Sequence, residues 1–406
     1  GKSLGIVTTS DVFDATPGAF GSHTQDRGAG TGICDQYLDE MTKKANLRVL
    51  LGGGRKWFLP STVPGSARAA ASDYILPAEL ASGWGLSGAA VGAVDPERNL
   101  IAGFQGAGFS YVANKSELMA LGHGSTKLLG LFAYSNMNVA KDKLDKRRGV
   151  STVVDDYGFP DQPMLEEMTA VALNVLKKNA NGFVLMVEAA SIDKQAHNMD
   201  TERWLLDTVE FDKAIGVAKK FAAENPDTLI LVTADHECAG INIIGAATRT
   251  LADLKAVSVN PDQATAIANL RNGTVGVYEA AGFPVYSLHA DGYPAATDVD
   301  YKMLIGYAGN ADRYENWLTN PRPLRDSQQP FNSVPPLSLY PNGPLARDAD
   351  SNFLITGQVP GASAVHTGSD IPLTASGRGA SLFKGVVDNT DVFFLAMQAA
   401  IGGATQ

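Results

Sequence analysis

Cysteine and long apolar runs are scarce in this sequence, and both shortages narrow the class of protein. Among 406 residues only Cys34 and Cys238 are cysteines, so no disulfide framework holds the fold together. Two cysteines this far apart could pair or stay free. No apolar run approaches the roughly 18 residues that a membrane-spanning helix needs. The chain begins at Gly1 without an initiator methionine or a signal peptide, so we expect a processed or truncated product.

Basic residues are outnumbered by acidic ones, which argues against nucleic acid or an anionic membrane as partner. The chain has 33 Lys and Arg against 43 Asp and Glu, a formal net charge of −10. A phosphate substrate is not excluded, because a cluster of metal cations can reverse the charge locally. With 45% apolar residues, the chain is long enough to bury one large core or a core plus an added module.

Short apolar runs alternate with helical patterns through the first 246 residues. Strands are predicted at residues 5–9, 47–51, 182–188 and 229–233, and helices at residues 163–176 and 201–224. Asp200 is expected to cap the last of these helices, which Asn225-Pro226 ends. The predicted strands are apolar without a polar face, as parallel strands covered on both sides are. We therefore predict an α/β fold, a three-layer α/β/α sandwich with a large, mostly parallel central sheet.

The regular pattern weakens from about residue 247. A helical stretch at residues 261–270 precedes a region in which seven prolines fall between residues 320 and 344, and this density excludes a regular helix or a central strand there. Order returns with a strand-like run at residues 371–375 and a final helix at residues 389–401. We predict one core from residues 1–246 and 366–406, with residues 247–365 as an irregular insertion or cap.

The strongest chemical signal directly follows the predicted strand at residues 182–188. The segment reads Glu188-Ala-Ala-Ser-Ile-Asp193-Lys194-Gln-Ala-His197. Asp193 and His197 are four residues apart, so on a helical turn they would face the same way and could bind one cation. A carboxylate oxygen and an imidazole nitrogen suit zinc. Taken alone, the pair is equally compatible with a surface Asp–His contact at a helix start.

Two further motifs carry histidine. Thr233-Ala-Asp235-His236 follows another apolar strand. Because adjacent side chains of a strand point to opposite faces, Asp235 and His236 can share a metal only if the strand has ended and the backbone has turned. The alternative is a polar loop. His366-Thr-Gly precedes the strand-like run at residues 371–375, and a lone histidine there is more often a loop residue than a ligand. His23, His123 and His289 are expected to be structural.

A fourth motif follows the first predicted strand. Asp14-Ala-Thr16-Pro offers an acid and a hydroxyl that could hold magnesium through oxygen. Arg27, some ten residues on, could bind a phosphate with two N–H groups. Taken alone, these residues are better interpreted as a helix cap with an arginine on the surface.

Together these motifs closely resemble the alkaline phosphatase family, bacterial type. The matching segments are Asp14-Ala-Thr-Pro with Arg27, Leu51-Gly-Gly-Gly, Leu128-Leu-Gly-Leu-Phe-Ala, the segment from Glu188 to His197, Thr233-Ala-Asp-His236 and His366-Thr-Gly. The resemblance spans nearly the whole chain and is weakest at residues 247–365. It implies hydrolysis of phosphate monoesters with two Zn²⁺ ions and one Mg²⁺ ion.

The resemblance also implies a role for each matching residue. The expected ligands of the first zinc are Asp193, His197 and His366; of the second zinc, Asp235 and His236; and of the magnesium, Glu188 and Thr16. Arg27 is the expected phosphate clamp. Asp14 and Lys194 are expected beside magnesium and phosphate, where some relatives carry histidines, and these exchanges are expected to alter magnesium affinity and turnover.

Two expected parts of the family pattern are not found in the sequence. The family's serine nucleophile lies in an Asp-Ser-Ala type of motif, and a further metal-bridging Asp lies earlier still. Asp326-Ser327 and Asp350-Ser351 occur, but neither is followed by Ala. We expect the serine on an N-terminal segment outside this sequence, which could be a separate fragment that partners the chain. We therefore expect residues 1–406 alone to be inactive and to bind metals poorly, and substantial activity would refute this.

Several alternatives stay open from sequence. A phosphodiesterase, sulfatase or mutase of the same superfamily is one, although Lys194 and Arg27 favour a dianionic monoester. A non-catalytic protein that binds phosphate or metal is another. The family further implies a periplasmic or extracellular location and the possibility of a homodimer.

Overall fold

The computed structural model describes most of the chain in two compact units. It describes residues 1–24, 26–68, 78–83, 85, 95–122, 124–150, 160–247, 274–275, 287–297, 303–311, 313–315, 353–355, 358–359 and 363–402. Unit 1 comprises Gly1–Ser191 and Glu210–Ala223, and unit 2 comprises Ile192–Val209 and Glu224–Gln406. Most of the predicted insertion at 247–365, including the helix at 261–270 and the prolines at 320–344, lies outside the described residues. These predictions therefore stay predictions.

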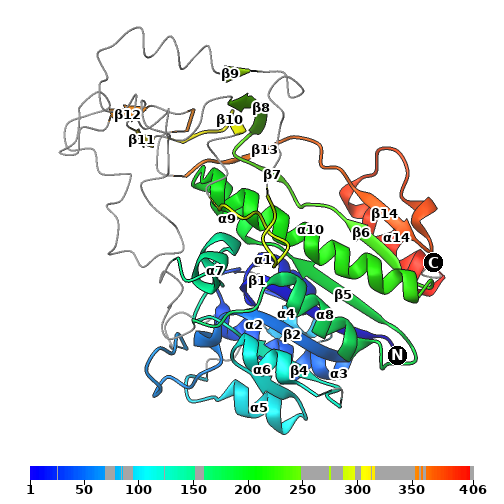
Figure 1. Ribbon diagram of the computed structural model, residues 1–406. Coiled ribbons are helices and arrows are strands. Elements are labelled where there is room, and N and C mark those ends of the chain that lie inside the picture. Colours follow the sequence, from blue (N-terminus) through cyan, green and yellow to red (C-terminus); the bar gives the residue numbers. More distant parts are fainter. Residues whose placement is uncertain are drawn as a thin grey trace. The chain divides into compact units, whose positions relative to one another are not determined.

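Unit 1 is built on five parallel strands. They are β1 (Ser3–Asp11), β2 (Leu47–Gly53), β3 (Ser110–Val112), β4 (Leu128–Leu131) and β5 (Phe183–Glu188), hydrogen-bonded in the order β3-β4-β2-β1-β5 (Figure 1). The pairs β1–β2, β1–β5, β2–β4 and β3–β4 are all parallel. The strands predicted at 5–9, 47–51 and 182–188 are confirmed.

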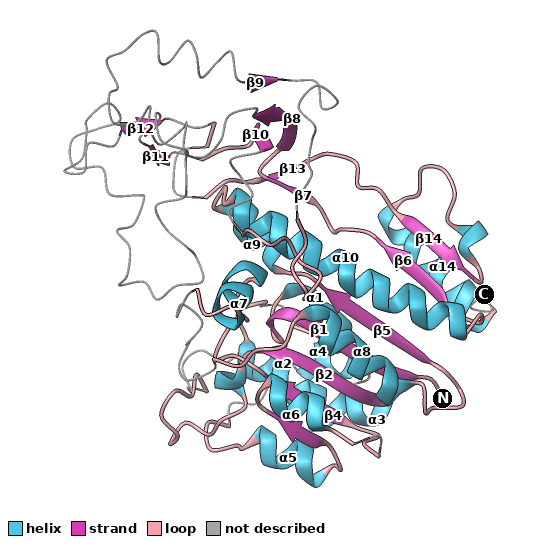
Figure 2. Ribbon diagram, in the orientation of Figure 1, coloured by secondary structure: helices cyan, strands magenta, loops and turns pink. Residues whose placement is uncertain are grey.

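The sheet of unit 1 is buried on both faces, which explains its continuous apolar runs. Every residue of β1 is buried. Successive side chains of a strand point to opposite faces, and Ile6 belongs to one apolar cluster while Val7 belongs to another. Figure 2 shows the magenta strands with cyan helices around them. The three-layer α/β/α arrangement predicted from sequence is confirmed in this unit.

The helices of unit 1 supply the outer layers. They are α1 (Ala15–Gly21), α2 (Gly30–Gln36), η1 (Tyr37–Met41), α3 (Thr42–Lys44), η2 (Arg55–Trp57), α4 (Ala78–Gly83), α5 (Leu100–Gly106), α6 (Lys115–Ala120), α7 (Ala140–Arg147) and α8 (Leu165–Leu176). Ile33 of α2 and Phe104 of α5 join the cluster that contains Ile6. Leu118 of α6 and Met168 of α8 join the cluster that contains Val7.

Two further helices follow β5. They are α9 (Ser191–His197) and α10 (Thr201–Glu224), and α10 has the predicted bounds. The Asp200 carboxylate accepts a hydrogen bond from the backbone N–H of Arg203 at 3.2 Å, so the predicted cap is confirmed. No helix among the described residues is both long and apolar enough to cross a bilayer.

Unit 2 contains short antiparallel pairs and a C-terminal helix. Its elements are β6 (Leu229–Val232), β7 (Glu237–Cys238), β8 (Ile241–Ala247), β9 (Thr274–Val275), β10 (Met303–Tyr307), β11 (Arg313–Glu315), β12 (Phe353–Ile355), β13 (His366–Thr367), β14 (Thr374–Gly377), η5 (Ala380–Leu382) and α14 (Asn389–Ile401). Hydrogen bonds join β6 to β14, β7 to β13, β8 to β9 and β10, and β11 to β12. Helix α14 has the predicted bounds.

Two strand predictions in unit 2 need correction. The apolar run at 229–233 forms a strand, but that strand is hydrogen-bonded antiparallel to β14 and not within a parallel sheet. The strand predicted at 371–375 begins only at Thr374. Pro372 has no N–H group to donate to a strand ladder, which explains the late start.

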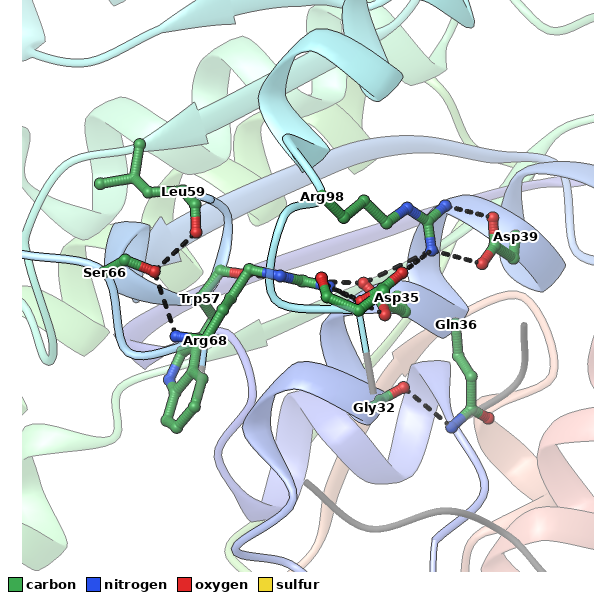
Figure 3. A network of polar contacts seen from close by, with 10 residues as sticks. Gly32, Asp35, Gln36, Asp39, Trp57, Leu59, Ser66, Arg68 and Arg98 are labelled. Atoms are coloured by element: carbon green, nitrogen blue, oxygen red, sulfur yellow. Dashed lines mark hydrogen bonds and ion pairs between the residues drawn. The ribbon is translucent and has the colours of Figure 1, made fainter. Parts of the chain in front are cut away.

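A buried network of charges lies beside α2 in unit 1. The Arg68 side chain is fully buried and binds the Asp35 carboxylate with two nitrogens, at 2.9 and 3.1 Å (Figure 3). It also donates to the carbonyl oxygen of Trp57 at 3.0 Å. Arg98 approaches Asp35 at 3.5 Å and binds Asp39 with two nitrogens, at 2.8 and 2.6 Å. The network ties two loops to α2 and η1.

The ionised form of the buried Asp35 carboxyl is stabilised by the arginines of this network. Burial raises the pKa of its carboxyl to about 7, although the hydrogen bonds and positive charge of Arg68 act in the opposite direction. Loss of Arg68 would leave a buried carboxylate without its closest cation.

Replacing Arg68 should therefore destabilise the protein strongly. We expect Arg68→Met to lower the free energy of unfolding by about 3–5 kcal/mol, measured by urea-induced unfolding, because one partner of a buried pair remains. The matched control is Arg378→Met. Arg378 pairs with Asp227 at 2.5 Å, but both side chains are at least 70% exposed, so about 1 kcal/mol or less is expected. Equal losses in both variants would contradict this account.

Candidate metal centre

Helix α9 presents Asp193 and His197 on one side. Their spacing of four residues spans about one helical turn, and Asp193 Oδ1 lies 3.4 Å from His197 Nε2. The helix follows β5, as the sequence indicated. Both side chains lie in unit 2 and are partly exposed. The local structure therefore matches the requirement that these two side chains face one ligand.

The short ribbon of β7 and β13 brings His366 to the same place. His366 is paired with Cys238 across the two antiparallel strands, and Thr367 is paired with Glu237. Because side chains alternate along a strand, His366 and Cys238 lie on one face of the ribbon. On the other, the Glu237 carboxylate accepts hydrogen bonds from Thr367 Oγ1 and from the backbone N–H of Gly240. These bonds hold the turn after β7 and so fix the ribbon.

Three donor atoms meet at distances that a tetrahedral metal requires. His366 Nε2 lies 3.0 Å from His197 Nε2 and 3.4 Å from Asp193 Oδ1. Zinc bonds of about 2.0–2.1 Å in tetrahedral geometry place neighbouring ligand atoms about 3.3 Å apart. The third side of the triangle, Asp193 Oδ1 to His197 Nε2, is 3.4 Å. The three separations are therefore close to those of ligand atoms around one tetrahedral zinc ion.

The surrounding hydrogen bonds also favour a metal. The Nδ1–H group of His197 donates to the carbonyl oxygen of Ala364 at 2.6 Å, which leaves the lone pair on Nε2. A bond of this kind orients a metal-binding histidine and makes it more basic. Asp193 Oδ1 is buried, and within the described structure only a protonated imidazole could donate a hydrogen bond to it. With the imidazoles neutral, such a buried carboxylate oxygen is costly unless a cation lies against it.

The charges of the cluster reinforce one another. Burial raises the pKa of Asp193, but the hydrogen bond and positive charge of His197 outweigh it and hold the pKa at about 2. The hydrogen bond that protonated His197 donates to Asp193 raises the pKa of His197 above 6.5, against the effect of burial. Burial and the charge of Asp193 raise the pKa of the Cys238 thiol. The carboxylate is thus ionised at neutral pH, while His197 must lose a proton to bind a metal.

Asp235 and His236 lie in the turn that follows β6. The strand ends at Val232 and β7 begins at Glu237, so both residues are outside regular structure, as their predicted role requires. Asp235 Oδ2 lies 3.1 Å from His236 Nε2. The His236 ring stacks on the His366 ring with centroids 3.5 Å apart. The structure therefore places this predicted pair directly beside the first cluster.

The remaining predicted site residues divide between the two units. Lys194 follows Asp193 on α9, and its positive charge only partly offsets the hydrogen bond with Asp193 that raises the pKa of His197. Glu188 ends β5 in unit 1, where its Oε2 accepts a hydrogen bond from Thr8 Oγ1 at 2.5 Å. Thr16 lies in α1, which contacts both β1 and β5. The structure thus groups Asp193, His197, Asp235, His236 and His366 in unit 2, and it places Glu188 and Thr16 separately in unit 1.

Asp14 and Arg27 meet beside α1 in unit 1. The Asp14 carboxylate caps α1 by accepting from the N–H of Ala15 at 2.8 Å, and it accepts from Arg27 Nη2 at 2.7 Å. Both line a cavity of about 330 Å³, together with Phe13, Gly18, Ser22 and other residues of this segment. The Arg27 side chain is 74% exposed. An open hollow with one exposed guanidinium can admit an anion.

The two cysteines do not pair. Neither forms a disulfide bond and both are buried, with Cys34 in α2 of unit 1 and Cys238 in β7 of unit 2. The sequence left this question open. The interpretation of the site from sequence missed that Cys238 lies with Asp193, His197 and His366, because the β7–β13 pairing joins segments far apart along the chain.

Unit 1 is an α/β sandwich, and unit 2 carries a cluster of histidine, cysteine and carboxylate side chains that could hold a metal. The family model described as alkaline phosphatase matches residues 1–401, and the chain belongs to the alkaline phosphatase family.

Several curated relatives are similar over part of their length. Alkaline phosphatase 4 of Bacillus subtilis is 32% identical over 60% of this chain and 42% of its own length. The human tissue-nonspecific alkaline phosphatase is 33% identical over 58% of this chain and 42% of its own length. The chicken tissue-nonspecific enzyme is 27% identical over 99% of this chain and 64% of its own length. The chain thus spans less than two thirds of these relatives.

Solved alkaline phosphatase structures share the fold. The enzyme of Thermus thermophilus superposes with a TM-score of 0.55 at 24% identity, over 100% of this chain and 72% of that one. A mutant of the TAB5 enzyme with Mg bound gives a TM-score of 0.53 at 17% identity, over 100% of this chain and 73% of that one.

Removal of one histidine should weaken zinc binding. We expect His366→Ala to reduce zinc affinity at least about tenfold in equilibrium dialysis with elemental analysis, because one of three converging donors is lost. The matched control is His289→Ala. His289 pairs with Asp291 at 3.0 Å outside the cluster, so its loss should leave zinc binding unchanged. Equal zinc binding by the wild type and His366→Ala would refute the assignment.

Zinc affinity should also fall on acidification. His197 binds metal only when neutral, and its pKa is raised above 6.5, so proton competition begins above that pH as the pH is lowered. We expect the displacement of the His197 proton to lower the affinity about tenfold per pH unit once the pH is below the raised pKa of His197. Calorimetric titration across this range measures the zinc affinity, and NMR titration of the metal-free protein measures the pKa of His197. Constant affinity through the measured pKa of His197 would contradict the prediction.

Proposed function

We propose that the protein hydrolyses phosphate monoesters with the help of two zinc ions and one magnesium ion. The observation that carries the proposal is the convergence of Asp193, His197 and His366 at tetrahedral spacing. Membership of the alkaline phosphatase family supports the same reaction. Metal-dependent phosphoryl transfer needs positioning and charge neutralisation more than proton transfer, and a donor cluster of this kind meets that need.

The first zinc would be held by Asp193, His197 and His366. Bound there, the metals would activate the attacking oxygen and stabilise the leaving oxygen. Asp193 contributes a negative charge that is retained at neutral pH. Burial raises the pKa of its carboxyl, but the stronger effect of His197 lowers that pKa to about 2. The Ala364 carbonyl fixes the tautomer of His197.

The other predicted ligands have weaker support. Asp235 and His236 would hold the second zinc, and their ligand atoms lie 3.1 Å apart. Glu188 and Thr16 would hold magnesium in unit 1, and the TAB5 enzyme with Mg bound supports a magnesium site in the family. Lys194 would add positive charge beside the first cluster. Each of these four ligands is assigned by the family resemblance rather than by a closed ligand shell.

Arg27 would clamp the phosphate of the substrate. A guanidinium presents paired N–H groups that match two phosphate oxygens. Asp14 holds Arg27 at 2.7 Å and is itself fixed as the cap of α1. Asp14 would thus position Arg27 rather than touch the substrate.

The covalent part of the proposal follows the family. We propose a phosphoserine intermediate whose serine lies outside residues 1–406, since neither Asp-Ser pair of the sequence matches the family motif. A periplasmic or extracellular location and a homodimer are further proposals. Fractionation of the source cells and analytical ultracentrifugation test them.

Replacing Arg27 should slow hydrolysis of nitrophenyl phosphate by the active protein that contains this chain. We expect Arg27→Ala to lower kcat/KM about 10- to 150-fold, because a charge-assisted hydrogen bond is worth about 1.5–3 kcal/mol. Arg27→Lys should recover part of the loss, because it keeps the charge but not the paired N–H groups. Arg378→Lys is the control, since Arg378 pairs with Asp227 on an exposed surface.

Comparison of substrates tests the reaction class. A phosphomonoesterase should turn over nitrophenyl phosphate far faster than its diester or sulfate analogue, and chelation should abolish the activity. Faster turnover of the diester or the sulfate would favour another enzyme of the superfamily. Zinc binding without turnover of any ester would favour a non-catalytic protein.

A further inference from the structure

Cys238 lies among the proposed zinc ligands, although the proposed function gives it no part. Its side chain is buried, with 7% of the residue exposed. It faces His366 across the β7–β13 pair, and its Sγ–H group points to the carbonyl oxygen of Asp193 at 3.8 Å. The thiol is therefore held between the ribbon and α9, which carry the other donors.

The ligand atoms of Asp193, His197, Cys238 and His366 form one group. All four atoms lie within 4.8 Å of one another. In a tetrahedral site, a Zn–S bond of about 2.3 Å places sulfur about 3.6 Å from the other ligands. The three N and O donors already meet this condition at 3.0–3.4 Å. The distance from the sulfur to its farthest partner, at most 4.8 Å, must therefore shorten by up to about 1.2 Å, which is less than the movement of Sγ between staggered χ1 positions.

We propose that Cys238 is the fourth protein ligand of the first zinc site. The proposal rests on the metal site of the proposed function. When the sulfur–metal bond forms, the thiol proton passes to solvent, and neither sulfur nor metal changes oxidation state. The resulting ligand set is one carboxylate, two imidazoles and one thiolate.

A thiolate would change the character of the site in two ways. It is a soft ligand, so it should favour Zn²⁺ and Cd²⁺ over hard cations such as Mg²⁺. Four protein ligands also complete a tetrahedral shell, whereas catalytic zinc sites keep one position open. A phosphate oxygen could then bind only if the shell expands to five ligands or the thiolate leaves. Cys238 would thus govern access of anions to this metal.

A different role for Cys238 is structural. Its Sγ–H group could merely hold the Asp193 carbonyl and so position α9. In that case the sulfur would stay protonated when the metal binds. Optical spectroscopy of a cobalt-substituted protein separates the two roles, because only a cobalt-bound thiolate gives an intense near-ultraviolet charge-transfer band.

The experiment is a Co²⁺ titration of the metal-free protein followed by absorption spectroscopy. We expect visible bands of tetrahedral cobalt together with the thiolate band, both saturating at the same cobalt concentration. Cys238→Ser should lose the thiolate band, keep the visible bands and bind cobalt at least about tenfold more weakly. Cys34→Ala is the matched control, because it removes the other cysteine from α2 in unit 1 and should keep both sets of bands. Circular dichroism checks that each variant is folded.

Three results would overturn the proposal. Tetrahedral visible bands without a thiolate band in the wild type would leave the zinc site of the proposed function intact but remove Cys238 from it. A thiolate band that persists in Cys238→Ser and disappears in Cys34→Ala would place the ligand elsewhere. Absence of any cobalt binding by the wild type would overturn both this proposal and the metal site on which it rests.

Discussion

The candidate metal centre depends on three metal-ligand atoms that the fold holds close together. Two imidazole nitrogens and a carboxylate oxygen lie 3.0–3.4 Å apart, and lone pairs at this spacing repel one another unless a cation or proton lies between them. Helix α9 supplies Asp193 and His197, and the β7–β13 pair supplies His366. The fold thus maintains an unfavourable arrangement that a divalent metal makes favourable.

Much of the fold could be predicted from apolar patterning, because the apolar or polar character of each residue indicates whether that residue is buried. Strands covered on both faces give continuous apolar runs, as in β1, and the 24-residue helix α10 carries its cap in Asp200. Partner choice is not recorded in this way. An apolar run such as β6 predicts that a strand forms but not which strand it pairs with. The pairing of β6 with β14 was therefore known only from the structure.

The candidate site shows the same limit. The spacing of Asp193 and His197 is a local property of one helix turn, and it predicted their mutual contact. The meeting of His366 with both of them was expected only through family resemblance, because His366 reaches the cluster by a pairing between distant segments. Cys238 escaped notice for that reason, although it directly follows Asp235, His236 and Glu237 in the sequence, a signal that could have marked it. The roles of Glu188, Thr16, Asp14 and Arg27 stay predictions supported by their places in unit 1.

X-ray absorption at the zinc edge of the zinc-loaded protein tests the central claim most directly. The account predicts a low-coordinate shell at about 2.0–2.1 Å that includes the outer-shell scattering of two imidazole rings. His197→Ala and His366→Ala should each remove one imidazole from that shell. A shell of oxygen atoms alone, or one unchanged in both variants, would contradict the convergence of Asp193, His197 and His366 on one metal ion.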